Sequence, residues 1–507
     1  MVAVDLDFSG RRAAATSAHA RWLSLGDRRV LVAALVALVA LRLLLIFWLP
    51  VTDSTEARYI EIARKMLVSG DWITPQFDVG VPFWGKPPLH TWLSAIGMKL
   101  FGIGHFGARI LIFLTSAAVV LLCADWVARE RGRDQALVAA VVMASSLMFF
   151  GAAAFVMTDM VMVLGTVLSM VAFHTCVTAA TPRRRAGYLF FIGLAIGLLA
   201  KGPVATVLTG LPIFLWLLAG RRWHLLGRLP WATGLLLMLA LTLPWYLAAE
   251  IKTPGFLHYF IVGEHFERFV VPGWSGDLYG SGHVQPKGMI WLFALGVFLP
   301  WTGFALALLA RAGRVAGAVR GDATGWLSYL GFWSLSPLIL FTPAANILPA
   351  YALPAIPPAA ILLTALWAEV RGRPGRVSRL AVAGSLLASL SLFLAVALMA
   401  QFAPLSLTRK SEMTLVAEAR RIDPDMTLTY WGGRSPSGEF YSGGTAQSAT
   451  DTVALRALLS NGRRDAIAVA PQSLAEVSAV VGTAFLDVGT FGRRLLLVET
   501  PTDGKKP

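Results

Sequence analysis

Apolar segments long enough to cross a bilayer recur along most of this chain, and they limit its possible folds more than any other feature. A helix needs about 20 predominantly apolar residues to cross the hydrocarbon core of a membrane. The first such segment, near residues 29–49, follows a basic tail that contains Arg11, Arg12, Arg21 and Arg28. No small-residue cleavage site follows it, so we interpret it as a retained signal-anchor rather than a cleaved signal peptide.

The composition agrees with a polytopic α-helical membrane protein. Of the 507 residues, 56% are hydrophobic and 14% are charged, whereas roughly a quarter of the residues of a soluble domain are charged. Together with the first segment, the further apolar runs predict about eleven transmembrane helices. The further runs lie near residues 107–128, 135–152, 160–179, 186–200, 204–219, 229–249, 289–310, 325–341, 348–367 and 380–402.

Arginine-rich loops alternate with loops of mixed charge, and this pattern predicts the orientation. Cytoplasmic loops carry an excess of Lys and Arg. We therefore expect a cytoplasmic tail over residues 1–28, a transmembrane domain over 29–402 with long outer loops at 50–106 and 250–288, and an outer C-terminal end. The net charge of +15 then reflects topology, and no nucleic-acid partner is expected. The basic loops contain Arg129, Arg131 and Arg133; Arg183, Arg184 and Arg185; Arg221, Arg222 and Arg228; Arg311, Arg314 and Arg320; and Arg371, Arg373, Arg376 and Arg379.

The C-terminal region alternates helical and strand patterns. Helices are expected near residues 412–421, 452–459 and 473–481, and strands near 427–431, 466–470, 484–488 and 495–499. This alternation predicts a small extramembrane α/β domain over residues 403–507.

The first outer loop carries two candidate catalytic carboxylates, Asp53 and Glu56. An amphipathic helix follows them at the membrane surface, with Glu61, Arg64 and Lys65 on its polar face, and it ends at Ser69-Gly70. Asp53 can serve as the N-cap of this helix. The alternative is a carboxylate at the end of the first span that faces a cleft at the membrane surface, with Glu56 one turn further on.

Other ionisable residues are predicted on the same side of the membrane. Lys86 precedes two prolines, which fix a rigid, non-helical bend. It either snorkels to the interface or holds a lipid phosphate. Asp159 and Lys201 lie in short outer turns and either pair with each other or take part in catalysis. His265 and Arg268 are spaced to share a helical face in the second long loop.

These residues, in this order, resemble the GT-C class of polyprenyl-phosphate-sugar-dependent glycosyltransferases. The nearest family contains the protein O-mannosyltransferases and the lipid A aminoarabinose transferases. The resemblance runs from about residue 30 to 400. The matching stretches are residues 56–66, which include Arg58 and Tyr59, and residues 69–72, 86–89, 158–159, 201–203, 264–269 and 348–354.

Two positions depart from the family pattern. The family usually carries Asp immediately before Glu at the end of the first span, where this chain has Thr55 before Glu56. The catalytic carboxylate is therefore Asp53 if the loop is shifted and Glu56 if it is not. The aminoarabinose transferases carry Glu, linked to metal binding, where this chain has Gly85. That change leaves a divalent metal as an open possibility and argues against the aminoarabinose substrate.

The resemblance implies an inverting glycosyltransferase at the outer face of a bacterial inner membrane, in lipopolysaccharide or envelope-glycan modification. The expected partners are a polyprenyl-phosphate-linked sugar as donor and a lipid, glycan or protein as acceptor. Asp53 or Glu56 would be the general base. The donor phosphate would contact Lys86, His265 and Arg268, with Arg58, Tyr59, Asp159 and Lys201 in support. No nucleotide is expected. Two other hypotheses remain at this point: a multi-pass lipid flippase or transporter, and a non-catalytic scaffold for envelope assembly.

Overall fold

The structure is a computed structural model that describes residues 23–53, 55–181, 183–280, 282–372, 374–402 and 409–500. Three arginines of the N-terminal tail, and Arg373, lie outside these residues. The chain forms two compact units. The first unit comprises residues up to 43, 82–90 and 111–393, and the second comprises 44–81, 91–110 and residues from 394 onward.

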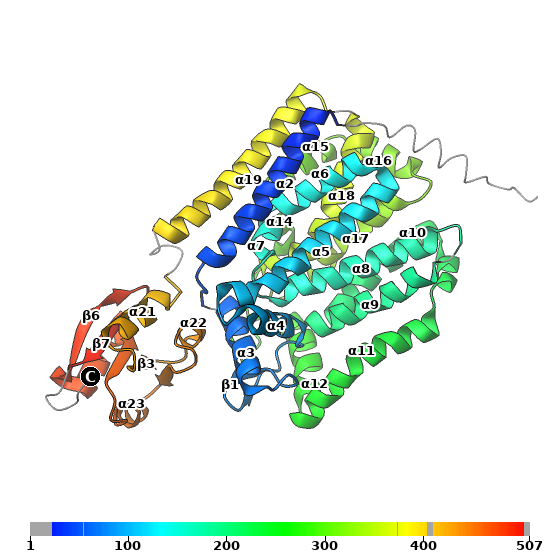
Figure 1. Cartoon of the computed structure of the whole chain (residues 1–507). Helices are drawn as coiled ribbons and strands as arrows, with labels where there is room; N and C mark the ends of the chain where they lie inside the picture. Colours follow the sequence, from blue (N-terminus) through cyan, green and yellow to red (C-terminus); the bar gives the residue numbers. More distant parts are fainter. Residues whose placement is uncertain are drawn as a thin grey trace, which may run out of the picture. The chain divides into compact units, whose positions relative to one another are not determined.

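Among its described residues, the regular secondary structure of the first unit is helical, apart from Pro82 at the end of β2 and an isolated bridge between Val284 and Asn346 (Figure 1). Most of α2, α5 and α19 belongs to it. Its elements are α2 (Leu25–Trp48), α5 (His105–Arg131), α6 (Arg133–Ser145), α7 (Leu147–Ala152), α8 (Thr158–Thr178), α9 (Arg184–Lys201), α10 (Pro203–Gly220), η1 (Trp223–Arg228), α11 (Trp231–Lys252), α12 (Phe256–His258), η2 (Tyr259–Glu267), α13 (Arg268–Val270), α14 (Met289–Val297), α15 (Thr302–Leu309), α16 (Ala312–Gly321), α17 (Trp326–Phe341), η3 (Pro349–Ala355), α18 (Ile356–Arg371) and α19 (Arg376–Phe402).

Seven of the described helices are long and apolar enough to cross a membrane, and an eighth span results if the bent pair α14 and α15 is one span. Each predicted range is largely helical, but the predicted count of eleven is not confirmed. The range 135–152 is divided at Ser146, whose extended backbone separates α6 from α7. The range 289–310 is divided into two helices at an angle of 115°. Hydropathy alone does not detect such breaks, because the residues around them are also apolar.

The core of the first unit is rich in aromatic side chains. Trp126 of α5, Trp216 of α10 and Tyr329 of α17 are almost fully buried. The rings of Trp126 and Trp216 each pack edge-on against Tyr329. A long aromatic side chain can fill the space between neighbouring helices while its polar atom bonds to a backbone carbonyl. The Tyr329 hydroxyl accordingly donates to the carbonyl oxygen of Met170 on α8.

The second unit combines helices with a two-stranded and a five-stranded sheet. Its elements are α3 (Thr55–Ser69), β1 (Gln76–Asp78), β2 (Val81–Pro82, at the boundary of the unit), α4 (Leu89–Phe101, mostly in this unit), α21 (Met413–Ile422), β3 (Thr427–Trp431), α22 (Pro436–Tyr441), β4 (Gln447–Ala449), α23 (Thr452–Leu459), β5 (Asp465–Val469), η4 (Pro471–Ser473), α24 (Leu474–Val481), η5 (Gly482–Ala484), β6 (Phe485–Phe491) and β7 (Arg494–Glu499).

The five strands of the C-terminal sheet have the order β4-β3-β5-β7-β6. β3 pairs in parallel with β4 and β5, whereas β7 is antiparallel to both β5 and β6. Alternate residues of a strand point to opposite faces. Leu428 and Tyr430 therefore pack with α21 on one face, and Trp431 packs with residues of α23 and α24 on the other.

Helix α3 ends at Ser69, as the sequence predicted. Gly70 follows it with a positive φ of 71°. The polar face of α3 is not open to solvent, however. Glu61, Arg64 and Lys65 are all buried. The prediction of a surface-lying amphipathic helix was wrong for this face, because residues near 434–443 cover it and supply opposite charges and carbonyl oxygens.

Candidate functional site

The first unit brings Lys86 next to the segment 259–268, far away in the sequence. The prolines that follow Lys86 keep its backbone non-helical before α4 begins. The Lys86 ammonium nitrogen Nζ lies 2.5 Å from Glu264 Oε2 and also donates to the carbonyl oxygen of Gly85. The lysine side chain is 19% exposed, whereas that of Glu264 is 3% exposed. Lys86 is thus held by a buried carboxylate and keeps partial access to its surroundings.

Arg268 shares the same carboxylate. Its Nη1 lies 2.9 Å from Glu264 Oε1 and 3.1 Å from Asp277 Oδ2. Glu264 therefore bridges Lys86 and Arg268 through its two oxygen atoms. The predicted i,i+3 relation of His265 and Arg268 assumed a regular α-helix, but residues 259–267 form the π-helix η2. Within this stretch of the chain, Arg268 pairs with Glu264, four residues earlier.

Tyrosine hydroxyl groups brace this cluster. The Tyr259 hydroxyl donates to Glu264 Oε1 at 3.4 Å and accepts from the backbone N–H of Leu278. The Tyr279 hydroxyl accepts from the Trp84 N–H and donates to the carbonyl oxygen of Pro82. These bonds connect the segment between β2 and Lys86 with the loop that carries Asp277.

Asp159 and Lys201 pair with each other, which was one of the two predicted alternatives. Lys201 Nζ lies 2.5 Å from Asp159 Oδ1 and 4.6 Å from the centre of the Tyr351 ring. Gly202 follows with φ 83°, a conformation that favours glycine, and it allows α10 to start at Pro203. The pair is buried, and each charge has a partner as burial requires.

His265 contacts main-chain carbonyl oxygens with both ring nitrogens. Its Nδ1 lies 2.7 Å from the oxygen of Phe260, and its Nε2 lies 3.2 Å from the oxygen of Lys201. The ring therefore connects η2 to the end of α9. This arrangement favours a positioning role for His265 over direct phosphate binding, because neither nitrogen points away from the protein backbone.

The charges in this cluster influence one another. Burial lowers the pKa of the Lys86 ammonium group, and the adjacent Glu264 carboxylate opposes that shift. Burial by itself would raise the pKa of Glu264, but Lys86 and Arg268 hold it below its ordinary value. Burial and nearby Lys86 lower the pKa of His265. Lys86 and Arg268 thus favour the charged form of Glu264, and Glu264 in turn opposes the loss of the proton from Lys86.

In the second unit, both carboxylate oxygens of Asp53 accept hydrogen bonds from the start of α22. Oδ2 accepts from the Ser435 hydroxyl and Oδ1 from the Ser437 N–H, both at 2.8 Å. Asp53 therefore lies at the N-terminus of α22. Burial raises the pKa of Asp53 despite these bonds. A raised pKa suits a general base that must accept a proton near neutral pH.

Two further charged residues influence Asp53. Arg494 attracts the negative charge of Asp53, and the carboxylates of Asp53 and Glu412 repel each other. Glu412 Oε1 is 3.5 Å from Arg494 Nε. Burial, with Asp53 nearby, raises the pKa of Glu412 to about 7. The neighbourhood of Asp53 therefore contains a second carboxyl group whose pKa is raised by burial.

Glu56 is held by Arg109 in a buried, two-pronged ion pair. Arg109 Nε lies 2.8 Å from Glu56 Oε1, and Nη2 lies 2.7 Å from Oε2. Arg109 also donates to the carbonyl oxygens of Ile46 and Leu49 at the end of α2. Because both carboxylate oxygens of Glu56 bind the guanidinium, the geometry favours a structural role for Glu56. The other predicted supporting residues on α3 are Arg58, which is half-buried, and Tyr59, which is buried.

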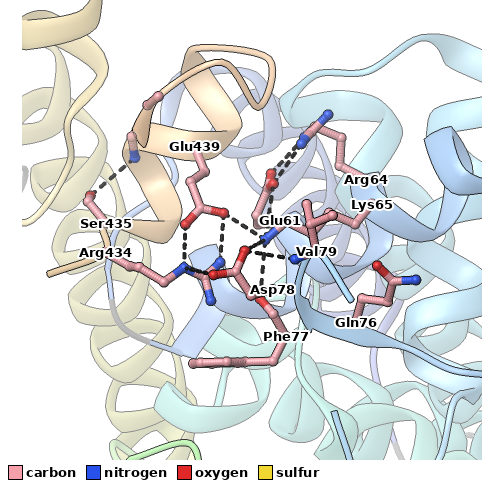
Figure 2. A network of polar contacts seen from close by, with 12 residues as sticks. Glu61, Arg64, Lys65, Gln76, Phe77, Asp78, Val79, Arg434, Ser435 and Glu439 are labelled. Atoms are coloured by element: carbon pink, nitrogen blue, oxygen red, sulfur yellow. Dashed lines mark hydrogen bonds and ion pairs between the residues drawn. The ribbon is translucent and has the colours of Figure 1, made fainter. Parts of the chain in front are cut away.

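Beside these residues, an ion-pair network connects α3 with α22 and with the loop before it (Figure 2). Lys65 Nζ lies 2.7 Å from Glu439 Oε2, and Glu61 binds Arg64 with both oxygens. Arg434 closes the network on Glu439 through two hydrogen bonds of 2.8 Å and on Asp78 at 3.3 Å. The network gives each of these charges an opposite partner.

No metal-binding set is present among the residues that the structure describes. Nowhere in them do three or more His, Cys, Asp or Glu side chains lie close enough together to hold a metal ion. Gly85, at the position where the resembling transferases carry Glu, supplies no ligand. We therefore derive no chemical step through a metal.

Several residues of these clusters were not predicted as site residues: Glu264, Asp277, Tyr259, Tyr351, Arg109, Ser435, Ser437 and Glu439. Glu264 and Tyr351 belong to stretches that carried the family resemblance, and this was a usable signal for them. The remainder had no local signal, because their partners lie far away in the sequence.

Residues 28–260 match the family described as dolichyl-phosphate-mannose-protein mannosyltransferase. A curated relative in Edwardsiella ictaluri, named undecaprenyl phosphate-alpha-4-amino-4-deoxy-L-arabinose arabinosyl transferase, is 31% identical over 335 residues, 64% of this chain and 57% of the relative. A protein of the same name in Pseudomonas aeruginosa is 34% identical over 328 residues, 62% of this chain and 55% of the relative. The chain thus spans little more than half the length of these relatives.

Among solved structures, ArnT from Cupriavidus metallidurans bound to undecaprenyl phosphate superposes with a TM-score of 0.76 at 20% sequence identity. The superposition covers 96% of this chain and all of that one. At this identity the similarity establishes the fold. This multi-pass membrane protein therefore has the fold of ArnT, and its sequence resembles the GT-C glycosyltransferase family of protein mannosyltransferases and aminoarabinose transferases.

Proposed function

We propose that this chain transfers a sugar from a polyprenyl phosphate to a hydroxyl or phosphate group of a lipid, glycan or protein acceptor. The observation that carries the proposal is the convergence of Lys86 and Arg268 on one buried carboxylate. Two partly exposed cations at one place form a binding site for a phosphate group. The ArnT fold and the names of the curated relatives support a lipid phosphate as the group bound.

In the proposed reaction, an acceptor oxygen attacks the anomeric carbon of the sugar with inversion. The bond between that carbon and the phosphate oxygen breaks, and its electron pair stays on the phosphate. Lys86 and Arg268 stabilise this developing charge. Asp53 takes the proton of the acceptor. His265, Lys201 and Asp159 position the phosphate-binding groups, and Glu56 holds the start of α3 through Arg109.

The relatives' names make 4-amino-4-deoxy-L-arabinose the first donor sugar to test. The resemblance to the lipid A aminoarabinose transferases makes a phosphate of lipid A the first acceptor to test. The presence of Gly85, where the aminoarabinose transferases carry Glu, argued against that sugar. We give the overall sequence similarity more weight than this one position. A single Glu-to-Gly change affects one contact, whereas the similarity to these relatives extends over more than 300 residues.

The function is tested by comparing a deletion strain with its parent by mass spectrometry of envelope lipids and glycans. We expect one sugar-bearing species to disappear and to return when the gene is restored. In parallel, the purified chain should consume undecaprenyl phosphate-linked aminoarabinose only when an acceptor is added. Donor binding or movement without sugar transfer would instead support a transporter or flippase. No change in any envelope component and no consumption of donor would support the scaffold hypothesis.

We further propose that the site faces the periplasm, with residues 1–28 in the cytoplasm and residues 403–507, the C-terminal α/β domain, outside the inner membrane. The arginine-rich loops support this orientation. A reporter that is active only in the periplasm should therefore be active when fused after Phe402, and a cytoplasmic reporter should be inactive there. The opposite result would reverse the topology and place the proposed site in the cytoplasm.

A further inference from the structure

Glu264 binds the two cations that the proposed function assigns to the donor phosphate. Its Oε2 contacts Lys86 and its Oε1 contacts Arg268, so the carboxylate makes the contacts that two oxygens of a phosphate would make. Its side chain is buried, while about a fifth of each cation remains exposed. A phosphate can therefore reach the cations from their exposed side and share them with Glu264.

We propose that Glu264 competes with the lipid phosphate product for Lys86 and Arg268, and that it thereby sets the rate at which the product leaves. This inference rests on the proposed function and adds to it a control of product release. It concerns a group that contacts Lys86 through one carboxylate oxygen and Arg268 through the other.

The reason lies in the charges of substrate and product. A sugar linked to a polyprenyl phosphate is a phosphodiester and carries one negative charge. After transfer, the lipid phosphate is a monoester with about −1.5 to −2 charges at neutral pH. A site built only from cations would therefore hold the product more strongly than the donor, and turnover would be limited by release.

The described cluster balances its charges in a way that offsets this preference. Lys86 and Arg268 contribute two positive charges, and Glu264 and Asp277 contribute two negative charges in direct contact with them. A buried carboxylate repels a second negative charge on the ligand, and low exposure to solvent strengthens this repulsion. The repulsion acts more strongly on the product than on the donor.

A purely structural role is the competing explanation. In that case Glu264 would only hold Lys86 and Arg268 in position, and its removal would weaken the binding of donor and product alike. The two explanations predict opposite changes in product affinity. A single substitution therefore distinguishes them.

The test is Glu264→Gln in the purified full-length chain, with undecaprenyl phosphate as the binding probe. Glutamine keeps the size of the side chain and removes the charge. We expect undecaprenyl phosphate to bind roughly tenfold more tightly, since one fewer buried negative charge faces it. Product inhibition should strengthen by a similar factor, kcat should fall, and KM for the donor should change less. Glu267→Gln is the matched control, because it removes the same charge from the same segment without contacting Lys86 or Arg268.

The pH dependence supplies a second readout. Without Glu264, Lys86 loses the anion that supports its protonated form, and burial lowers its pKa further. Lysine is charged below its pKa, whereas the lipid phosphate carries its second negative charge only above a pKa of about 6. The tighter binding should therefore be greatest above about pH 6 and should decline at higher pH, where Lys86 loses its proton. Asp277→Asn removes the second carboxylate on Arg268 while Glu264 stays in place, and we expect a smaller tightening. It serves as the test if Glu264→Gln does not fold.

Weaker or unchanged binding of undecaprenyl phosphate by Glu264→Gln would overturn the inference and assign Glu264 to positioning. For an unfolded Glu264→Gln chain, the same results in Asp277→Asn would decide. If the parent chain itself does not bind undecaprenyl phosphate, the proposed function fails, and that outcome is distinct because it does not depend on any variant.

Discussion

Replacing Asp53 with asparagine should abolish sugar transfer while leaving the chain folded. The asparagine amide oxygen can still accept from the Ser437 N–H, and its NH₂ group can donate to the Ser435 hydroxyl, so the contacts with α22 persist. The substitution removes the group proposed to accept the acceptor's proton. Loss of a general base typically lowers the rate by about 10² to 10⁴. The measurement is the initial rate of transfer per folded protein.

Glu56→Gln is the informative comparison, and the structure changes what it should show. Glu56 forms a buried ion pair with Arg109, and removing one partner of such a pair typically costs about 3–5 kcal/mol of stability. We therefore expect less folded protein but a near-parental rate for the part that folds. Should Asp53→Asn retain its rate and Glu56→Gln lose it per folded molecule, Glu56 is the base and Asp53 serves only the start of α22.

Lys86→Met should weaken use of the donor much more than it weakens folding. Methionine keeps the aliphatic part of the side chain and removes the charge that is proposed to hold the phosphate. Loss of a buried, charge-assisted contact typically costs about 2–5 kcal/mol, or some 30-fold or more in affinity. We expect this loss in kcat/KM for the polyprenyl-phosphate sugar, measured in membranes at matched protein levels.

The double variant Lys86→Met/Glu264→Gln makes this prediction sharper. In Lys86→Met, Glu264 loses one of its two ionic partners, keeps Arg268, and repels the phosphate more strongly. Neutralising Glu264 as well should therefore restore part of the lost donor affinity. An unchanged transfer rate in Lys86→Met would mean that the lysine only snorkels, and equal losses in the single and double variants would remove Glu264 from the phosphate site.

The sequence predicted the helical membrane fold and most C-terminal elements, because both depend on local patterns. Strand β3 lies at residues 427–431 and helix α23 at 452–459, as predicted. Alternating and helical periodicities in these stretches are strong. The short strand β4 and the short helix α22 were missed. A three-residue strand and a six-residue helix contain too few residues to show a period.

The site was predicted in part. Four site residues were identified from their charge and their position in the sequence. In the structure, Lys86 and Arg268 both pair with Glu264, and Lys201 pairs with Asp159. The sequence does not reveal which residue pairs with each charged side chain when the two residues lie far apart in the sequence. The π-helical turn at residues 259–267 also changes which side chains are neighbours, and hydrophobic periodicity does not reveal it.

The hydrogen bonds between Asp53 and α22 can form only after α22 has been synthesised. Asp53 and Ser437 are 384 residues apart in the sequence. At typical rates of synthesis, about 5–20 residues per second, α22 emerges some 20 to 80 s after Asp53. During that interval Lys65 lacks Glu439, its main partner. The residue proposed to start the chemistry thus reaches its final environment only near the end of translation, and a chain interrupted before Pro436 would insert its first helices without acquiring a functional base.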